Sequence, residues 1–418
     1  MLNTLNIGID ISLRKAAVSF LTQEGKYLGK TFEIDNNLPG FENLKEKTAT
    51  LISQQNFQHI RLGLEASSLY GFHLTDYFTN NPLRCETQVY LINAKYISRF
   101  KKAFPEKEKT DLTDAQFIAE YLRFGKLPVE YKPELLHLPL KRLVRYRYHL
   151  VKLIEREKKL FLANLFLMFP GWVQNKPIAH LGATSLTILN ELSPDEIVTM
   201  PLEELALLVA KAGKNRSPDP KSIAENIQKA ARESYRIRPQ LANSCQLILA
   251  SITKTLSALK KSLKEIDKAI AEEGKGFINP LLSIKGIGPV YAAGILASIG
   301  EIRRFLSDDK LARFAGLVWK RNQSGLSESE ERHLVQECDK YFRYYLIEAA
   351  NSLRVHNEEY QIYYQKKYME VTKHNHKRAL VLSARKLVRL VFALLSKNQL
   401  YDPVRAVSRP SRLKVNIK

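Results

Sequence analysis

The spacing of apolar residues changes once along this chain, near residue 140, and that change limits the folds open to it. Before it, helical stretches are expected at 41–53, 69–78 and 111–124, and strand-like runs at 5–11, 16–21, 27–34, 59–65 and 87–92. Three strands followed by strand–helix alternation predict an α/β domain with a mixed sheet. Beyond residue 140 the spacing is helical throughout. The sequence therefore predicts a multidomain α/β plus all-α protein.

The sharpest helical signal is a run of apolar residues spaced alternately by three and four. Its members are Leu249, Ile252, Leu256, Leu259, Leu263, Ile266 and Ile270. Heptad spacing over three repeats predicts a coiled coil or a long helical hairpin, with an ordinary amphipathic helix as the alternative. We expect an α/β domain at 1–135, a helical coiled-coil region at 136–272 with an irregular insert at about 170–235, a helical domain at 273–400 and a basic tail at 401–418.

The charge balance favours a polyanionic partner. Lys and Arg number 65 against 43 Asp and Glu, a formal net charge of +22, and neutralised phosphates release counterions that drive association. A merely basic housekeeping protein is the alternative. Three scattered cysteines argue against a disulfide framework or a zinc cluster. No signal peptide and no apolar run of membrane-spanning length stand out, so we expect a cytoplasmic protein without a membrane partner.

Four acidic residues occupy positions that suggest metal binding. Asp10 and Glu65 end predicted strands, while Asp111 and Asp114 begin a predicted helix, where a separation of three places them on one face. A carboxylate among apolar strand residues is costly to bury without a compensating charge. Magnesium, or manganese as an alternative, prefers oxygen ligands and supports phosphoryl transfer. Each acid alone has a structural explanation, such as helix capping or solvation.

The region after residue 273 offers basic and glycine-rich positions for nucleic acid. Residues 282–300 are typical of a helix–hairpin–helix element, in which Gly286 and Gly288 let backbone N–H groups approach a phosphate beside Lys285. A tight interhelical turn without a ligand is the alternative. Further basic candidates for nucleic-acid contact are Lys320, Arg321, Arg343, Lys377 and Arg378.

These motifs resemble one known family. Gly8-Ile-Asp-Ile-Ser12, Leu64-Glu-Ala-Ser-Ser-Leu-Tyr-Gly71 and the run from Lys109 to Ala119 are similar to the N-terminal motifs of bridge-RNA-guided insertion-sequence transposases. In that family a DEDD domain of the RuvC-like, RNase H-type fold precedes a C-terminal serine transposase domain. The C-terminal segments Ile284-Lys-Gly-Ile-Gly-Pro289 and Gln323-Ser-Gly325 fit the serine domain.

The resemblance implies roles for particular residues. Asp10, Glu65, Asp111 and Asp114 take the metal-binding positions, and Ser324 takes the position of the catalytic serine. It also implies DNA as substrate, a structured non-coding guide RNA and a homo-oligomer, dimer or tetramer, formed through the coiled coil. The chain departs from the family where Glu337-Cys-Asp-Lys-Tyr-Phe-Arg343 replaces a Gly-Asn pair before a Leu-Arg step. Whether the acids and the serine meet within one chain or between two stays open.

Two other functions remain compatible with the sequence. A metal-only nuclease of the Holliday-junction type would use the four acids, with Ser324 as a turn residue. A non-catalytic nucleic-acid-binding protein would use only the positive charge. The first alternative requires cleavage that survives loss of the serine, and the second requires binding without cleavage.

Overall fold

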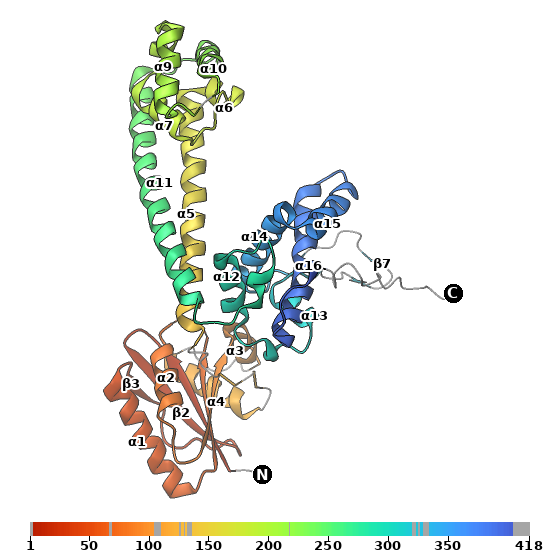
Figure 1. Ribbon diagram of the computed structural model, residues 1–418. Helices are drawn as coiled ribbons and strands as arrows, with labels where there is room; N and C mark the ends of the chain where they lie inside the picture. The colour runs from red at the N-terminus through yellow and green to blue at the C-terminus, as the bar shows by residue number, and fades with distance from the viewer. Residues whose placement is uncertain are drawn as a thin grey trace. The chain divides into compact units, whose positions relative to one another are not determined.

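The computed structural model of the chain (Figure 1) divides into two compact units, Met1–Leu135 and Leu136–Lys418. It describes residues 3–66, 69–103, 110–124, 127–128, 130–131, 136–216, 218–319, 323–324, 327–328 and 334–403. The predicted basic tail lies outside the described residues from 404 onward.

The first unit is built on a five-stranded mixed sheet. Its strands are β1 (Thr4–Ile11), β2 (Lys15–Thr22), β3 (Phe32–Asp35), β4 (His59–Glu65) and β5 (Glu86–Ile92), in the spatial order β3-β2-β1-β4-β5. The pairs β1–β2 and β2–β3 are antiparallel, whereas β1–β4 and β4–β5 are parallel. The predicted mixed sheet is confirmed. Strand β3 begins later than expected, because Gly25 and Gly29 adopt positive φ and turn the chain before it.

Helices cover both faces of this sheet. Helices α1 (Leu38–Gln55) and α2 (Phe72–Asn80) pack with the β1 side chains Leu5, Ile7 and Ile9 in one apolar cluster. Helices α3 (Ala94–Lys101) and α4 (Asp111–Arg123) contribute Ile97, Ile118 and Leu122 to a smaller cluster on the other face. The sequence predicted α1, α2 and α4, but it gave no signal for α3.

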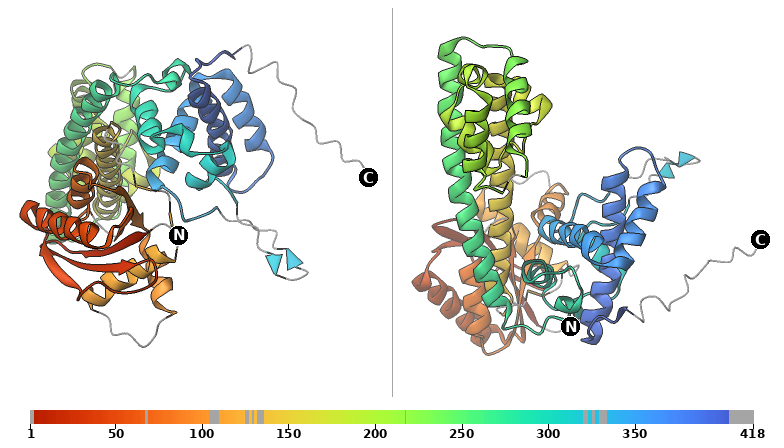
Figure 2. Two further views of the ribbon diagram at one scale, coloured as in Figure 1. Left: turned by 90° about the horizontal axis from the view of Figure 1, so that it is seen from below. Right: turned by 45° about the horizontal axis from the view of Figure 1, so that its top comes forward.

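Two long helices dominate the second unit. Helices α5 (Leu138–Met168) and α11 (Pro239–Gly274) lie side by side as an antiparallel pair in every view (Figures 1 and 2). The predicted heptad residues Leu249, Ile252 and Leu256 are buried in this pairing. Of the two structures predicted from the heptad spacing, the chain forms the long helical hairpin.

The segment between the two long helices is more regular than predicted. It contains α6 (Pro170–Asn175), α7 (Ala183–Glu191), α8 (Pro194–Thr199), α9 (Leu202–Ala212) and α10 (Pro220–Arg232). Two prolines of this segment begin helices: Pro194 and Pro220 each occupy the first turn, where a missing N–H costs nothing.

The rest of the second unit is a helical domain with its own core. Its elements are the 3₁₀ turn η1 (Pro280–Ser283), α12 (Pro289–Ile299), the 3₁₀ turn η2 (Ile302–Arg304), α13 (Asp308–Phe314), β6 (Gln323–Ser324), β7 (Ser327–Glu328), α14 (Lys340–His356), α15 (Glu358–Met369) and α16 (Asn375–Lys397). The prediction of a full helix before the Gly286 hairpin is wrong, because only the four residues of η1 form there after Pro280.

None of the described helices is both long enough and apolar enough to span the core of a bilayer.

Candidate active site

Two neighbouring strands of the first unit carry an acidic residue at or next to their last position. In the parallel pair β1–β4, Gly8 lies opposite Gly63 and Ile9 lies opposite Leu64. The register therefore brings Asp10 and Glu65 to the same end of adjacent strands. Each acid follows its glycine by two residues, so that acid and glycine face the same side of the sheet.

The glycines let helix α4 lie directly on this side of the sheet. A methyl group at Gly8 would collide with the Ala115 carbonyl oxygen and the Ala119 nitrogen, both backbone atoms of α4. Four helical residues advance about 6 Å and two strand residues about 6.6 Å. A helix fixed at Ala115 over Gly8 thus carries its first residue, Asp111, to the level of Asp10.

The N-terminus of α4 is closed by a threonine pair and not by its acids. The Thr110 and Thr113 side chains each accept from the backbone N–H of the other residue, forming a capping box. Asp111 is exposed and Asp114 is largely buried, with 15% of its side chain accessible. Both carboxylates are consequently left for interactions outside the cap.

Asp10 feels the charges of the other three acids. Its pKa is raised to about 6, first by burial and then by the negative charges of Asp114, Asp111 and Glu65, against the lowering effect of Lys101. The Lys101 Nζ lies 2.7 Å from Asp114 Oδ1. The sequence did not predict a basic residue in this cluster.

The chemistry of these side chains fits a divalent cation. Carboxylate oxygens are the ligands that magnesium and manganese prefer, and burial together with nearby negative charge disfavours ionised Asp10, a cost that such an ion would relieve. Within the described part of the chain, no three His, Cys, Asp or Glu side chains converge closely enough to form a ready ligand set. Metal binding at this cluster would require its side chains to rearrange, beginning with the ion pair of Asp114.

We expect the substitution Asp10→Asn to raise the melting temperature in EDTA by about 2–4 °C near pH 8. The raised pKa means that folding favours protonated Asp10, so its ionisation destabilises the native state increasingly as the pH rises from 3.8 toward about 6. The gain should shrink as the pH is lowered from about 7 to about 4.5. Differential scanning calorimetry across that range checks it, with exposed Asp35→Asn as the control. A gain that did not change with pH would contradict this origin.

Ser324 lies in a short hairpin of the second unit. It ends β6, which pairs with β7 through the register Ser324↔Ser327. The backbone leading into and out of this hairpin is paired, because Val335 N–H donates to the Val318 carbonyl (3.0 Å) and Trp319 bridges Leu334. Lys320 and Arg321 lie outside the described residues.

Arg343 joins the two ends of this segment. From α14 its guanidinium donates to the carbonyls of Ala315 (3.1 Å), Gly316 (3.0 Å) and Val335. Gly316 has a φ of 65°, and a Cβ there would collide with the guanidinium. The sequence predicted a nucleic-acid contact for Arg343, whereas the structure directs its donors to the backbone that carries Ser324.

Asp339, within the segment that departs from the family pattern, has a local structural role. Asp339 caps α14 by accepting from Tyr341 N (3.0 Å) and Phe342 N (2.8 Å), and it pairs with Arg145 of α5 at 3.3 Å. Asp339 therefore caps the N-terminus of α14, the helix that carries Arg343.

The two glycines of the predicted DNA-binding hairpin have different surroundings. Gly286 has a φ of 105° and packs against Leu353 and His356 of α14, so its missing side chain serves internal packing. Gly288 precedes α12, and a Cβ there would meet no atom within 4 Å. The exposed residues Lys285 and Gly288 remain the parts of this hairpin that a phosphate could reach.

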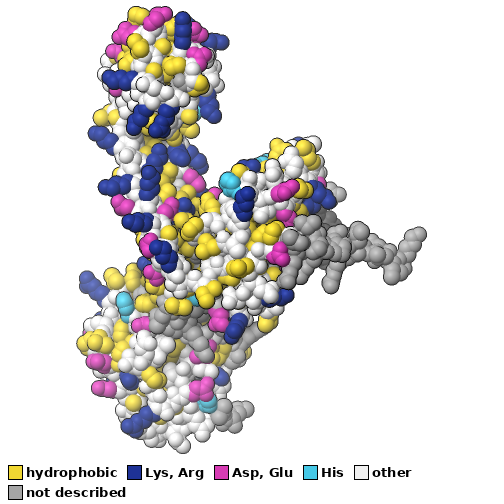
Figure 3. Space-filling view, viewed as in Figure 1, with side chains coloured by type: hydrophobic (Ala, Val, Ile, Leu, Met, Phe, Trp, Pro, Cys, Tyr) yellow, Lys and Arg dark blue, Asp and Glu magenta, His cyan; other side chains and the backbone are white. Residues whose placement is uncertain are grey.

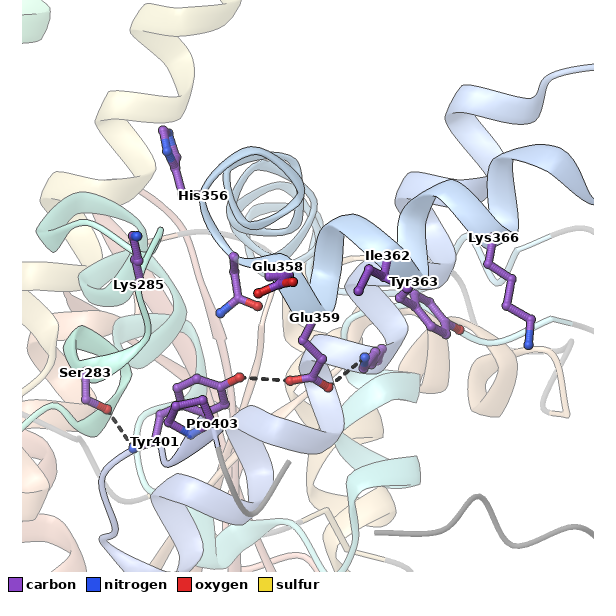
Figure 4. Close-up of a pocket in the computed structure, with 12 residues that line it drawn as sticks. Ser283, Lys285, His356, Glu358, Glu359, Ile362, Tyr363, Lys366, Tyr401 and Pro403 are labelled. Carbon is purple, nitrogen blue, oxygen red and sulfur yellow. Dashed lines mark hydrogen bonds and ion pairs between the residues drawn. The ribbon is translucent and has the colours of Figure 1, made fainter. Parts of the chain in front are cut away.

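Lys285 also lines a cavity of about 850 Å³ (Figure 4). Its walls come from the hairpin, the α14–α15 corner, α15 and the segment after α16. The negative charge of Glu359 in the cavity is compensated, because Lys386 pairs with its carboxylate at 2.7 Å and the Tyr401 hydroxyl donates a hydrogen bond to it at 2.8 Å. Lys285 and Lys366, which also line the cavity, are exposed.

The remaining predicted basic residues lie at the start of α16. Lys377 and Arg378 are both exposed, and Arg378 pairs with Glu370 at 3.0 Å. A larger basic surface was not among the predicted sites. Figure 3 shows Lys and Arg side chains along the α5–α11 hairpin. The exposed ones are Arg142, Lys152, Arg156, Lys158 and Lys159 on α5, and Lys254, Lys260, Lys261, Lys264 and Lys268 on α11.

Comparison with known protein families gives two matches along the chain. Residues 7–170 match the family model for the DEDD transposase domain of the IS110 type, described as "Transposase". Residues 278–365 match the model described as "Transposase IS116/IS110/IS902 family". Together the two matches cover more than half of the chain. The chain belongs to the IS116/IS110/IS902 family of transposases.

Two curated proteins are similar to this transposase. An uncharacterized 44.8 kDa protein of insertion element IS116 from Streptomyces clavuligerus is 23% identical over 329 residues, which are 77% of this chain and 79% of that protein. A probable family 20 transposase from Pseudomonas aeruginosa is 26% identical over 166 residues, 37% of this chain and 47% of that protein. The family makes this chain an enzyme of DNA transposition, and its DEDD domain indicates a dependence on divalent metal.

Proposed function

We propose that this transposase cuts and rejoins DNA through Ser324, assisted by a divalent ion, preferably Mg²⁺, held by Asp10, Glu65, Asp111 and Asp114. The observation that carries the proposal is the register that brings Asp10 and Glu65 to the same end of adjacent strands, with Asp111 and Asp114 close enough for their charges to raise the pKa of Asp10. The strand order and pairing of the first unit support an RNase H-like, RuvC-like fold, in which strand-end acids bind metal.

The reaction is a phosphoryl transfer to the protein. The Ser324 Oγ attacks the phosphorus of a DNA phosphodiester and loses its proton. A bond forms between Oγ and phosphorus, while the bond from phosphorus to the leaving sugar oxygen breaks and that oxygen takes up a proton. Attack by a second sugar hydroxyl on the phosphoserine reverses these steps and rejoins DNA. When bound, the metal ion would stabilise negative charge on the phosphate oxygens.

Nucleic-acid binding is assigned to the exposed basic surfaces of the second unit. The ten exposed lysines and arginines of the α5–α11 hairpin suit a polyanion, as do Lys285 and the open N-terminus of α12 at Gly288. We assign to them both the DNA and a structured non-coding guide RNA. Pairing with the RNA would then select the DNA sequence, and the protein would read backbone shape and charge.

A homo-oligomer, dimer or tetramer, also belongs to this proposal. The heptad seam of α11 is used within the chain, so a different surface must join protomers. Helix α5 carries an exposed apolar stripe at seven-residue spacing, with Tyr146, Leu153, Leu160 and Leu167 each 43–53% accessible. This stripe supports association through the outer side of the hairpin.

A covalent-trapping experiment tests the central step. The full chain is mixed with DNA spanning the element junction, RNA transcribed from the flanking non-coding region, and Mg²⁺, and protein–DNA adducts are separated on a denaturing gel. Wild type should form an adduct that Ser324→Ala abolishes and that Asp10→Asn reduces by at least about 10²-fold. Ser352→Ala, on α14 away from the serine hairpin, is the matched control and should keep the adduct.

The alternatives give different outcomes in the same assay. Metal-dependent cleavage that persists in Ser324→Ala without an adduct would replace the serine mechanism by a metal-only nuclease. Binding to DNA with no cleavage under any metal or RNA condition would leave a non-catalytic nucleic-acid-binding protein.

A further inference from the structure

A lysine lies within the carboxylate cluster of the first unit. Lys101 Nζ is 2.7 Å from Asp114 Oδ1, and both side chains are mostly buried, with 23% and 15% of their surfaces accessible. Its charge also acts on Asp10, where it opposes the effect of the three other acids. Lys101 thus supplies positive charge to both Asp114 and Asp10.

Contacts distant in sequence hold Lys101 in that place. Asn93 caps α3 by accepting from Lys95 N, and Ile97 is fully buried beneath the helix. The Phe100 ring meets Tyr121 and Phe124 at the C-terminal end of α4, with centroids 5.5 and 5.7 Å away. These contacts pack the last turn of α3 on α4, so that the next side chain, Lys101, extends toward Asp114. Lys102, one position further, is exposed.

We propose that Lys101 is an internal counter-ion of the four-carboxylate site that competes with the divalent cation for Asp114. In the metal-free protein it offsets carboxylate repulsion and keeps α3 against α4. A cation that takes Asp114 as a ligand must first displace the ammonium, whose flexible stem allows it to move away. The affinity for metal is therefore lower than the four carboxylates alone would give.

This inference rests on the metal site of the proposed function. The expected change in metal affinity follows from Coulomb's law. A positive charge in contact with a carboxylate stabilises it weakly in water and several times more strongly at a partly buried site. Its removal should therefore strengthen Mg²⁺ binding by about tenfold or more. It should also lower the melting temperature in EDTA, because nothing then offsets the repulsion among the acids.

Isothermal titration of the full chain with Mg²⁺, repeated with Mn²⁺, tests the inference without any activity assay. The variants are Lys101→Met and the polar Lys101→Gln, in case the apolar change impairs folding. Lys102→Met is the matched control, since it removes the same charge from an exposed neighbour. Both Lys101 variants should bind metal about tenfold more tightly and melt lower in EDTA, whereas Lys102→Met should match wild type in both measurements.

Asp10→Asn distinguishes a failure of the counter-ion inference from a failure of the proposed metal site. If it weakens metal binding while both Lys101 variants bind like wild type or more weakly, the counter-ion inference is overturned and the metal site stands. If Asp10→Asn leaves metal binding unchanged, the proposed metal site is overturned, and the inference falls with it. Equal tightening in Lys102→Met would attribute the effect to net charge and would also overturn the role of Lys101.

Discussion

Replacing Gly8 by alanine should separate helix α4 from the sheet and disable the acidic site. The added methyl group would collide with backbone atoms of Ala115 and Ala119, which cannot turn away as a flexible side chain can. We expect a destabilisation of about 3 kcal/mol. We also expect metal affinity to fall by about 10- to 100-fold, because Asp111 and Asp114 move with the helix away from Asp10.

Two measurements on the full chain check this expectation. Chemical denaturation gives the change in stability, and isothermal titration with Mg²⁺ gives the change in affinity. Gly276→Ala is the control, because its new methyl group would meet no atom closer than the Glu273 carbonyl oxygen at 3.6 Å. Metal binding at wild-type strength in Gly8→Ala would mean that the position of α4 over β1 does not assemble the site.

The second large effect is expected at Arg343. Arg343→Met removes the donors that tie Ala315 and Gly316 to Val335 across the base of the serine hairpin. Small displacements of a reacting group are costly, so we expect covalent adduct formation through Ser324 to fall by about 10²-fold. Stability should fall by only about 1–3 kcal/mol, because the loss is confined to these hydrogen bonds.

The affinity for DNA distinguishes positioning from direct contact. If Arg343 positions the serine hairpin, Arg343→Met should keep the wild-type dissociation constant for junction DNA while losing adduct. Arg354→Met, on the same helix, is the control; that arginine contacts Asn351 and the Tyr364 ring and should affect neither quantity. A loss of DNA affinity in Arg343→Met would instead support the nucleic-acid contact predicted from sequence.

The positions of Asp10 and Glu65 at strand ends could be predicted because the sequence signal for them is local. Gly8-Ile-Asp10 and Gly63-Leu-Glu65 each place a glycine two residues before an acid at a strand end. Such spacing fixes which face carries the acid and where a helix can approach, and it needs no knowledge of distant contacts. The extent of β4, His59–Glu65, was predicted to the residue.

Lys101 and Arg343 could not be assigned their places from sequence because their positions depend on distant contacts. Lys101 reaches Asp114 only because Phe100 packs against α4, about twenty residues further along. In the sequence, nothing distinguishes Arg343 from the other basic residues of a DNA-binding domain. Its guanidinium can reach the backbone only because Gly316 has no side chain to block it. The missing helix before Gly286 has a different cause: Pro280 and the nearby hairpin leave room for one 3₁₀ turn, although the apolar spacing is helical.

The α5–α11 hairpin belongs to two separate cores of the second unit. At one end Leu140, Val144 and Ile270 pack with the domain that carries Ser324. At the other end Leu165, Met168 and Cys245 pack with α6–α10. Inserting seven residues into each helix would lengthen the hairpin by about 10 Å and leave every side chain on its original face. The hairpin is thus an adjustable spacer, whose reach can change in heptad steps without repacking either core.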